Sequence, residues 1–285
     1  MKLYLPQLKR EAVGGGWSFA RSFAQQARGW AEFVDNPMKA DIYFVPSATM
    51  VGDKYEPEKI KANGAKIVLR VDNALKNSNN RNTGMPRMKK FGELADLVIY
   101  QSEWARGYLE PFVGKSGPVV LNGINQDIFK PDDSMVKTGN IYLYSRSSRD
   151  DQKGWHRAWY EYQMIQRENP EAQLRIVGRF SQENLEYNFD FFMGEKYLYL
   201  GHIQTAEAMA RIYQDADYLL FTAYNDAASN TLIEALSCGV KIYPTWELTT
   251  GGTPEIIEGY KNNGLKWLSA ERMVSEYRKA IESIL

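Results

Sequence analysis

The segment from Phe221 to Pro244 constrains the fold of this chain more than any other. It reads FTAYNDAASNTLIEALSCGVKIYP and carries the signals of a strand end, a polar turn, a helix, a glycine stop and a second strand. Ser229 and Asn230 are favoured helix N-cap residues, and Gly239 stands where a helix often ends in a left-handed residue. A helix that follows a parallel strand points its first backbone N–H groups at the ligand crevice of the sheet. We therefore expect a parallel α/β sheet that binds an anionic ligand.

Two carboxylates flank this predicted helix. Asp226 precedes it and Glu234 lies about one turn inside it, with seven residues between them. One side chain reaches a ligand on the helix N-terminus, near Ser229, Asn230 and Thr231, and the other reaches the far end of that ligand. Carboxylates accept hydrogen bonds from hydroxyl groups, so the pair predicts an anionic ligand that carries hydroxyl groups, such as a sugar nucleotide. Taken alone, Glu234 also fits an exposed helix position.

Short apolar runs alternate with helical patterns along the whole chain, which is typical of parallel sheets with helices on both faces. The runs lie at 2–8, 41–46, 66–71, 95–100, 140–144, 172–178, 198–203 and 217–221. A length of 285 residues suits two such domains, and the polar stretch 132–139 is the expected linker. We predict domains at 1–134 and 135–285, the second ending in an amphipathic helix at 271–285.

The chain resembles the retaining glycosyltransferases of family four (glycosyl transferases group 1). Asp226 and Glu234, followed by Ala-Leu-Ser-Cys-Gly, resemble the E-x7-E motif of that family, which usually has Glu where this chain has Asp226. The segments 95–131 and 140–255 are similar to the family as well. The resemblance implies the GT-B fold, two doubly wound Rossmann-like domains facing a cleft, with the last helix often packing back on the first domain. Asn122 and Gly123, in the first of these segments, also predict a tight turn with positive φ.

The resemblance assigns a role to each residue of the donor site. Arg146 and Lys153 hold the donor diphosphate, with Arg149 as a rival, because a departing nucleoside diphosphate gains negative charge that cations stabilise. Glu234 binds the ribose hydroxyls and Asp226 the hydroxyls of the sugar. The list is completed by the amides of Ser229, Asn230 and Thr231 at the diphosphate and by Gly178 beside the base.

Four further residues are expected to belong to the site from the N-terminal domain. Gly15 and Gly16 open a helix after the first strand, where glycine lets the backbone approach a ligand closely; a tight turn that binds nothing is the alternative. They do not form the GxGxxG of a dehydrogenase. Asp72 follows the strand 66–71, where many family members have a histidine. We interpret Arg70 and Asp72 as cleft residues, with a strand-end cap as the alternative for Asp72.

The resemblance implies a retaining, metal-independent enzyme of the hexosyltransferase type. It moves a sugar from a nucleotide-sugar donor, UDP- or GDP-linked, to a sugar, lipid or other acceptor, and needs no cofactor. The sequence offers no well-placed nucleophile, so we favour same-face attack assisted by the leaving phosphate over a covalent carboxylate. The alternatives are a GT-B sugar-nucleotide epimerase or phosphorylase, and a non-catalytic sugar-nucleotide-binding protein, which the departures at Asp226 and Asp72 would fit.

Composition argues against several classes of site. Two histidines and a single cysteine, Cys238, do not make a zinc cluster or an intrachain disulfide. Asp215-Ala-Asp217 spells the DxD of metal-dependent GT-A enzymes, but it lies between a helix and a buried strand, so we expect no metal there. The net charge is +0, so we expect no nucleic acid. The chain shows no apolar run of membrane-spanning length and no signal-peptide segment, so we expect a cytoplasmic protein.

The polar stretch 74–88 is expected to be a loop with cations concentrated around it. They are Arg81, Arg87, Lys89 and Lys90. One interpretation is a solvated surface loop, and the other is an acceptor lid that meets an anionic acceptor or a membrane surface. The 19 basic and 15 acidic residues up to residue 135 lean slightly toward the second.

Overall fold

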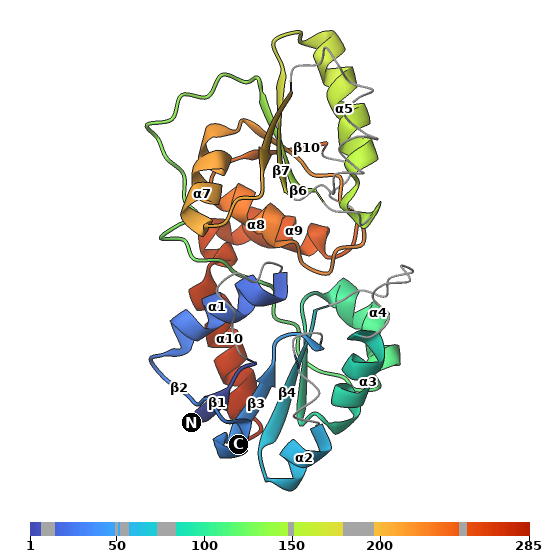
Figure 1. The fold of residues 1–285 in the computed structure, drawn as a ribbon, viewed down its shortest axis with the longest axis vertical. Helices are drawn as coiled ribbons and strands as arrows, with labels where there is room; N and C mark the ends of the chain where they lie inside the picture. Colours follow the sequence, from blue (N-terminus) through green and yellow to red (C-terminus); the bar gives the residue numbers. More distant parts are fainter. Residues whose placement is uncertain are drawn as a thin grey trace. The chain divides into compact units, whose positions relative to one another are not determined.

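The computed structural model describes residues 1–6, 15–48, 51, 57–72, 84–147, 151–178, 197–244 and 250–285. The chain forms two compact units. Unit 1 comprises Met1–Asn125 and Gly251–Leu285, and unit 2 comprises Gln126–Thr250. Each unit contains a five-stranded sheet in which all neighbouring strands are parallel, flanked by helices (Figure 1). The prediction of two doubly wound α/β domains is confirmed.

The sheet of unit 1 has the strand order β2-β1-β3-β4-β5. Its strands are β1 (Lys2–Tyr4), β2 (Glu32–Phe33), β3 (Ile42–Val45), β4 (Lys66–Val71) and β5 (Leu97–Tyr100). Its helices are α1 (Gly15–Ala27), η1 (Pro37–Lys39), α2 (Pro57–Ala62), α3 (Gly84–Leu94), α4 (Glu103–Val113), α9 (Thr253–Asn263), η6 (Gly264–Leu268) and α10 (Ala270–Glu282). Helices α1 and α10 cover one face of the sheet and α2, α3 and α4 lie on the other (Figure 1).

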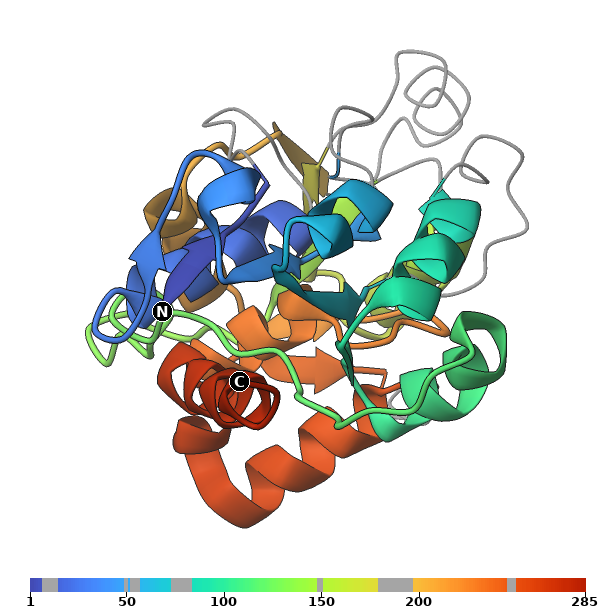
Figure 2. The same ribbon diagram turned by 90° about the horizontal axis from the view of Figure 1, so that it is seen from below.

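Helix α10 belongs to the core of unit 1, as the resemblance led us to expect for the last helix. Its residues Met273, Val274, Tyr277 and Ile281 recur every three or four positions, are buried, and pack with α1 against the sheet. Both chain ends therefore lie on unit 1 (Figures 1 and 2). Compared with the predicted 1–134 and 135–285, residues 126–134 group with unit 2, and Gly251–Leu285 group with unit 1.

The sheet of unit 2 has the strand order β10-β9-β6-β7-β8. Its strands are β6 (Ile141–Ser147), β7 (Gln173–Gly178), β8 (Tyr197–Gly201), β9 (Tyr218–Leu220) and β10 (Lys241–Tyr243), and its helices are η3 (Asp151–Lys153), α5 (Trp155–Glu168), α7 (Ala206–Asp215) and α8 (Asn230–Ser237). Helix α5 covers one face of the sheet, and α7 and α8 lie on the other (Figure 1). The direction of winding reverses between β6 and β9, and open α/β sheets bind ligands at such a switch point.

Three local expectations are wrong. Residues 84–88 of the predicted loop belong to α3, because Pro86 lies in the first helical turn, where a missing N–H costs little; residues 73–83 lie outside the described part. Gly123 does not have a positive φ. Its backbone instead contacts the start of α10, since a Cβ atom would lie 2.2 Å from the Ser269 carbonyl oxygen. Strand β6 continues through Ser147 instead of ending at Tyr144.

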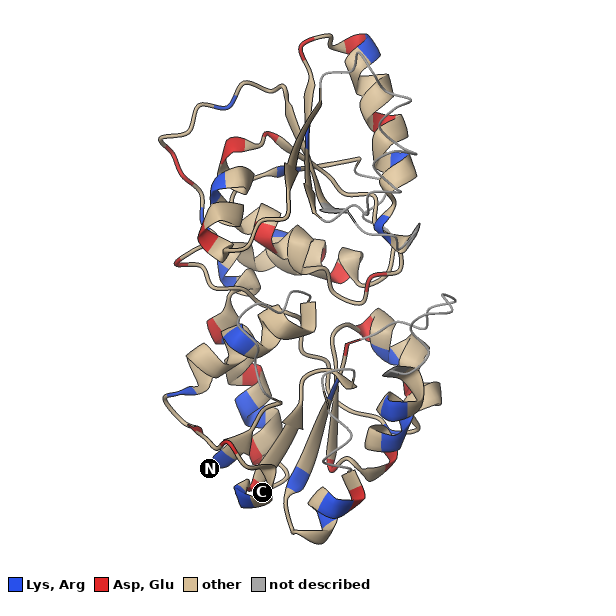
Figure 3. Ribbon diagram, viewed as in Figure 1, with Lys and Arg blue, Asp and Glu red and all other residues tan. Residues whose placement is uncertain are grey.

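Lys and Arg lie on several helices of unit 1, among them α2, α3 and α10 (Figure 3). Two of the cations around the predicted loop have internal partners: Arg87 donates to the Val51 carbonyl at 2.8 Å, and Lys90 pairs with Glu58 at 3.0 Å. Arg81 lies outside the described residues. Among the helices that the structure describes, none has the length and apolar character needed to cross a bilayer.

Two carboxylates stabilise unit 1 over long sequence distances. Glu255, in the first turn of α9, accepts hydrogen bonds from the backbone N–H groups of Glu103 at 2.7 Å and Trp104 at 2.9 Å, and so caps α4. Asp96 accepts from Lys61 at 2.6 Å and from the Ile67 N–H at 2.8 Å. Burial acts to raise the pKa of Asp96, but these bonds and the nearby lysine charges lower it below its ordinary value.

Candidate active site

Most of the predicted donor-site residues of unit 2 follow the carboxyl ends of β6 and β9, the strands that flank the switch point. Strand β6 pairs with β7 through an irregularity between Ser145 and Ser147, so the backbone of Arg146 lies at a β-bulge. Such bulges are over-represented beside active sites. The structure describes only the backbone of Arg146, and Arg149 lies outside the described residues.

Lys153 and Asp226 meet at this edge of the sheet. The Lys153 ammonium lies 3.5 Å from the Asp226 carboxylate, and their side chains are 21% and 17% exposed. Backbone contacts bring the two segments together: the Tyr224 N–H donates to the Gln152 carbonyl at 3.0 Å, and the Tyr144 hydroxyl donates to the Lys153 carbonyl at 3.0 Å. The cation before α5 is therefore fixed against the turn that follows β9.

Gly154 completes this attachment. It has a φ of +69°, and a Cβ atom on it would lie 2.1 Å from the Thr222 carbonyl oxygen. The Thr222 hydroxyl in turn donates to the Gly154 carbonyl at 2.8 Å. Both the left-handed backbone and the close approach require glycine at this position.

Helix α8 begins and ends with the caps that the sequence predicts. Ser229 is the N-cap, and its hydroxyl accepts from the Leu232 N–H, so Asn230 and Thr231 form the first helical turn. At the other end Gly239 has a φ of +77°. Its N–H donates to the Leu236 carbonyl and the Val240 N–H to the Ala235 carbonyl, which together form a Schellman motif. The expectation of a glycine stop is confirmed.

Glu234 is partly buried on α8 and receives a hydrogen bond from the Tyr213 hydroxyl at 3.2 Å. The same hydroxyl lies 3.3 Å from the Ser145 hydroxyl, at the end of β6. Burial raises the pKa of the Cys238 thiol to about 12, and the charge of Glu234 adds to the shift. Cys238 therefore stays protonated at neutral pH and is not a nucleophile.

Gly178 is the last residue of β7, the strand that lies beside β6. It pairs with Ser147 of β6, and its carbonyl accepts a hydrogen bond from the Tyr199 hydroxyl at 2.8 Å. Seven predicted donor-site residues therefore lie along the carboxyl edge of one sheet: Lys153, Gly178, Asp226, Ser229, Asn230, Thr231 and Glu234. The roles assigned to them remain predictions.

The other predicted residues lie in unit 1. Gly15 and Gly16 begin α1, and Asp72 follows β4. Arg70 is only 2% exposed. It donates to the Pro46 carbonyl, Gln101 and Asn122, and its guanidinium lies 3.9 Å from the ring centre of Phe19. Arg70 thus serves the packing of β4, whereas Asp72 is partly exposed at the strand end.

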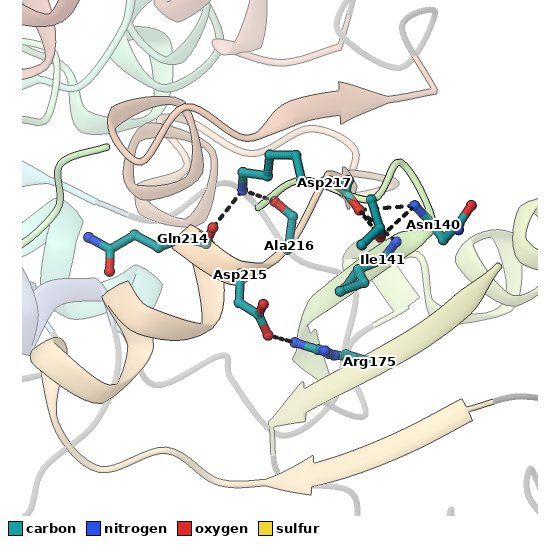
Figure 4. Close-up of polar contacts among 9 residues, drawn as sticks. Asn140, Ile141, Arg175, Gln214, Asp215, Ala216 and Asp217 are labelled. Atoms are coloured by element: carbon teal, nitrogen blue, oxygen red, sulfur yellow. Dashed lines mark hydrogen bonds and ion pairs between the residues drawn. The ribbon is translucent and has the colours of Figure 1, made fainter. Parts of the chain in front are cut away.

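The DxD sequence has a structural role. Asp215 forms an ion pair with Arg175 of β7, and Asp217 accepts from the backbone N–H groups of Asn140 at 3.0 Å and Ile141 at 2.9 Å (Figure 4). Both carboxylates are thereby engaged by protein donors. Within the described ranges, the structure contains no group of three or more His, Cys, Asp or Glu side chains arranged to hold a metal.

Tyr213 of α7 is not among the predicted site residues. In the sequence, helical periodicity makes it an ordinary member of the buried face. Tyr213 is indeed fully buried, but its hydroxyl reaches the site. The only sequence signal was that a buried tyrosine hydroxyl usually finds a partner.

The family model described as glycosyl transferases group 1 matches residues 139–285. The chain belongs to this family. None of the curated proteins compared matches the sequence.

Three solved structures resemble most or all of the chain. Sucrose-phosphate synthase from Thermosynechococcus elongatus superposes with a TM-score of 0.66 at 14% identity, over 99% of this chain and 95% of that one. Anabaena HepE in complex with UDP and glucose has a TM-score of 0.63 at 14% identity, over 99% of this chain and 96% of that one. Pneumococcal O-GlcNAc transferase GtfA in complex with UDP and GlcNAc has a TM-score of 0.60 at 13% identity, over 85% of this chain and 56% of that one. The fold is GT-B, and the enzyme is a glycosyltransferase.

Proposed function

We propose that this glycosyltransferase is retaining and metal-independent. It moves a hexose from a nucleotide-sugar donor, UDP- or GDP-linked, to a sugar, lipid or other acceptor, and uses no cofactor. The complexes of HepE with UDP and glucose and of GtfA with UDP and GlcNAc support a nucleotide-sugar donor. The single cysteine, Cys238, fits a reducing compartment and hence the cytoplasm.

One observation carries the proposal: Lys153, Asp226 and Glu234 gather at the switch point of unit 2. Lys153 has a charge suited to the donor diphosphate, together with Arg146 and the first-turn amides of α8 near Ser229, Asn230 and Thr231. Asp226 binds the sugar hydroxyls and Glu234 the ribose hydroxyls, with Gly178 beside the base. Gly15, Gly16 and Asp72 belong to the acceptor-side unit.

The reaction needs charge stabilisation more than a protein nucleophile. The acceptor oxygen forms a bond to the anomeric carbon on the face from which the phosphate oxygen leaves, and the acceptor proton passes to that phosphate oxygen. The products are the glycoside and the nucleoside diphosphate. Lys153 and Arg146 stabilise the negative charge that develops on the leaving group, which is the role a metal has in other enzymes. Asp226 pairs with Lys153, so we assign it to binding rather than to attack on the sugar.

The first experiment is a thermal-shift screen of UDP, GDP, ADP and their common sugar conjugates, with and without EDTA. A ligand at about 100 times its Kd adds about 2.7 kcal/mol of apparent stability. We expect one nucleotide to stabilise the protein regardless of EDTA. Lys153→Ala should abolish the shift, whereas Lys241→Ala removes the same charge from β10 and should leave it unchanged.

Turnover is then measured with the nucleotide that binds, using its sugar conjugates and a panel of acceptors. NMR of the product reports the anomeric configuration, and we expect the configuration of the donor. An inverted product would refute the retaining assignment, and activity that EDTA removes would refute metal independence. Nucleotide binding without turnover would favour the non-catalytic alternative.

A further inference from the structure

Tyr213 connects two parts of the candidate site through one hydroxyl group. Its oxygen lies 3.2 Å from Glu234 Oε2 on α8 and 3.3 Å from Ser145 Oγ at the end of β6. Ser145 immediately precedes Arg146, the residue at the β-bulge. The side chain that we assign to the ribose and the strand end that we assign to the diphosphate therefore share one contact.

The order of donors in this group follows from its chemistry. A tyrosine hydroxyl has one proton to donate, and a carboxylate only accepts. Tyr213 therefore donates to Glu234, and the proton of Ser145 completes its contact with the Tyr213 oxygen. The Tyr213 bond occupies one of about four lone-pair positions of the carboxylate. In the proposed complex, ribose hydroxyl groups donate to the same carboxylate.

The position of the Tyr213 hydroxyl is rigid. The side chain is 0% exposed, and its ring packs at 61° against Phe129, with the centroids 6.3 Å apart. The next residue, Gln214, donates to the Lys130 carbonyl at 2.8 Å. A glutamate side chain has several rotatable bonds, and a fixed donor reduces the entropy that Glu234 must lose when it binds a ligand.

We propose that Tyr213 positions Glu234 for the donor ribose and thereby sets the preference of the enzyme for ribonucleotides over 2′-deoxyribonucleotides. This inference rests on the proposed function, because it takes Glu234 as the ribose-binding residue. Tyr213 itself does not contact the donor. It acts through the carboxylate that it holds.

The test compares the affinities of the purified protein for UDP and 2′-deoxy-UDP, and for GDP and 2′-deoxy-GDP, by isothermal titration calorimetry. A ribose hydroxyl bonded to a carboxylate should give the wild type a preference of about tenfold for the ribonucleotide that it binds. Tyr213→Phe keeps the ring and removes only the hydroxyl. We expect the preference of this variant for the ribonucleotide to fall to about threefold or less. Most of the lost affinity should be affinity for the ribonucleotide.

Tyr162→Phe is the matched control. Tyr162 is also fully buried in unit 2, and its hydroxyl donates to the Ala172 carbonyl at 3.1 Å. This variant should lose stability and keep the wild-type preference. Ser145→Ala serves as a second variant, should Tyr213→Phe not fold, and should lower the preference by a smaller factor.

A Tyr213→Phe protein that loses the same factor of affinity for the ribonucleotide and for its 2′-deoxy counterpart would overturn the inference. A purely structural role of Tyr213 predicts that result. If that variant does not fold, an unchanged preference in Ser145→Ala would also overturn it. In both cases a wild type that still prefers the ribonucleotide leaves the proposed function standing. A wild type that binds none of the four nucleotides would refute the proposed function and this inference together.

Discussion

Replacing Gly154 by alanine tests whether the cation before α5 is fixed by the contact with the segment after β9. Gly154 has a φ of +69° and lies directly between Lys153 and α5. Alanine would introduce a strained backbone conformation and a Cβ atom 2.1 Å from the Thr222 carbonyl oxygen. The two effects can be separated, because Gly201 has a φ of +70° and no atom within 4 Å of the equivalent Cβ position.

The magnitude follows from these geometries. A left-handed alanine costs about 1–2 kcal/mol, and this cost is common to both substitutions. At Gly154 the backbone must also move away from Thr222, which breaks the hydrogen bond of 2.8 Å between the Thr222 hydroxyl and the Gly154 carbonyl. That loss adds about 1–2 kcal/mol. We therefore expect Gly154→Ala to lower the free energy of unfolding by about 2–4 kcal/mol, and Gly201→Ala by about 1–2 kcal/mol.

Urea denaturation followed by tryptophan fluorescence measures both values, since Trp155 begins α5 next to the substitution. Calorimetric titration with the nucleoside diphosphate that binds the wild type gives a second readout. Displacement of Lys153 in Gly154→Ala should lower the affinity for that nucleotide about tenfold or more. Gly201→Ala should retain the wild-type affinity. Equal destabilisation by the two substitutions, or unchanged affinity in Gly154→Ala, would refute the reasoning.

Three further predictions concern stability and metals. Glu255→Ala should cost about 1–2 kcal/mol of unfolding free energy in urea denaturation, because it removes the cap of α4, whereas Glu258→Ala on the same helix should cost less than about 0.5 kcal/mol. Asp96→Asn should cost about 1 kcal/mol at pH 7. The folded-state pKa of Asp96 is lowered, so the Asp96 carboxylate stabilises the fold at pH values above its ordinary pKa of 3.8. This stabilisation is lost as the pH falls through the folded-state pKa. A difference in unfolding free energy between wild type and Asp96→Asn that does not shrink as the solution is acidified would contradict this. Asp215→Asn should lower the melting temperature but leave transfer rates, with or without Mn²⁺, unchanged; loss of a Mn²⁺-dependent rate would show that the DxD sequence binds metal.

Short-range signals in the sequence determined the α/β class and the helix at the centre of the site. Ser229 and Gly239 cap α8 as predicted, because a cap depends on backbone groups within a few residues along the chain. The alternation of strands and helices, which is also a local pattern in the sequence, predicted two parallel sheets. Together with the family resemblance, these signals placed Lys153, Asp226 and Glu234 in one site.

The tertiary structure alone decided the contacts between residues that are distant in sequence. Lys153 and Asp226 are 73 residues apart, and Tyr213 meets both Ser145 and Glu234 from a helix that looked like ordinary core. The same holds for Gly123, which allows the close approach of Ser269. Such contacts depend on strand order and register, and these follow from the packing of the whole sheet rather than from any local pattern.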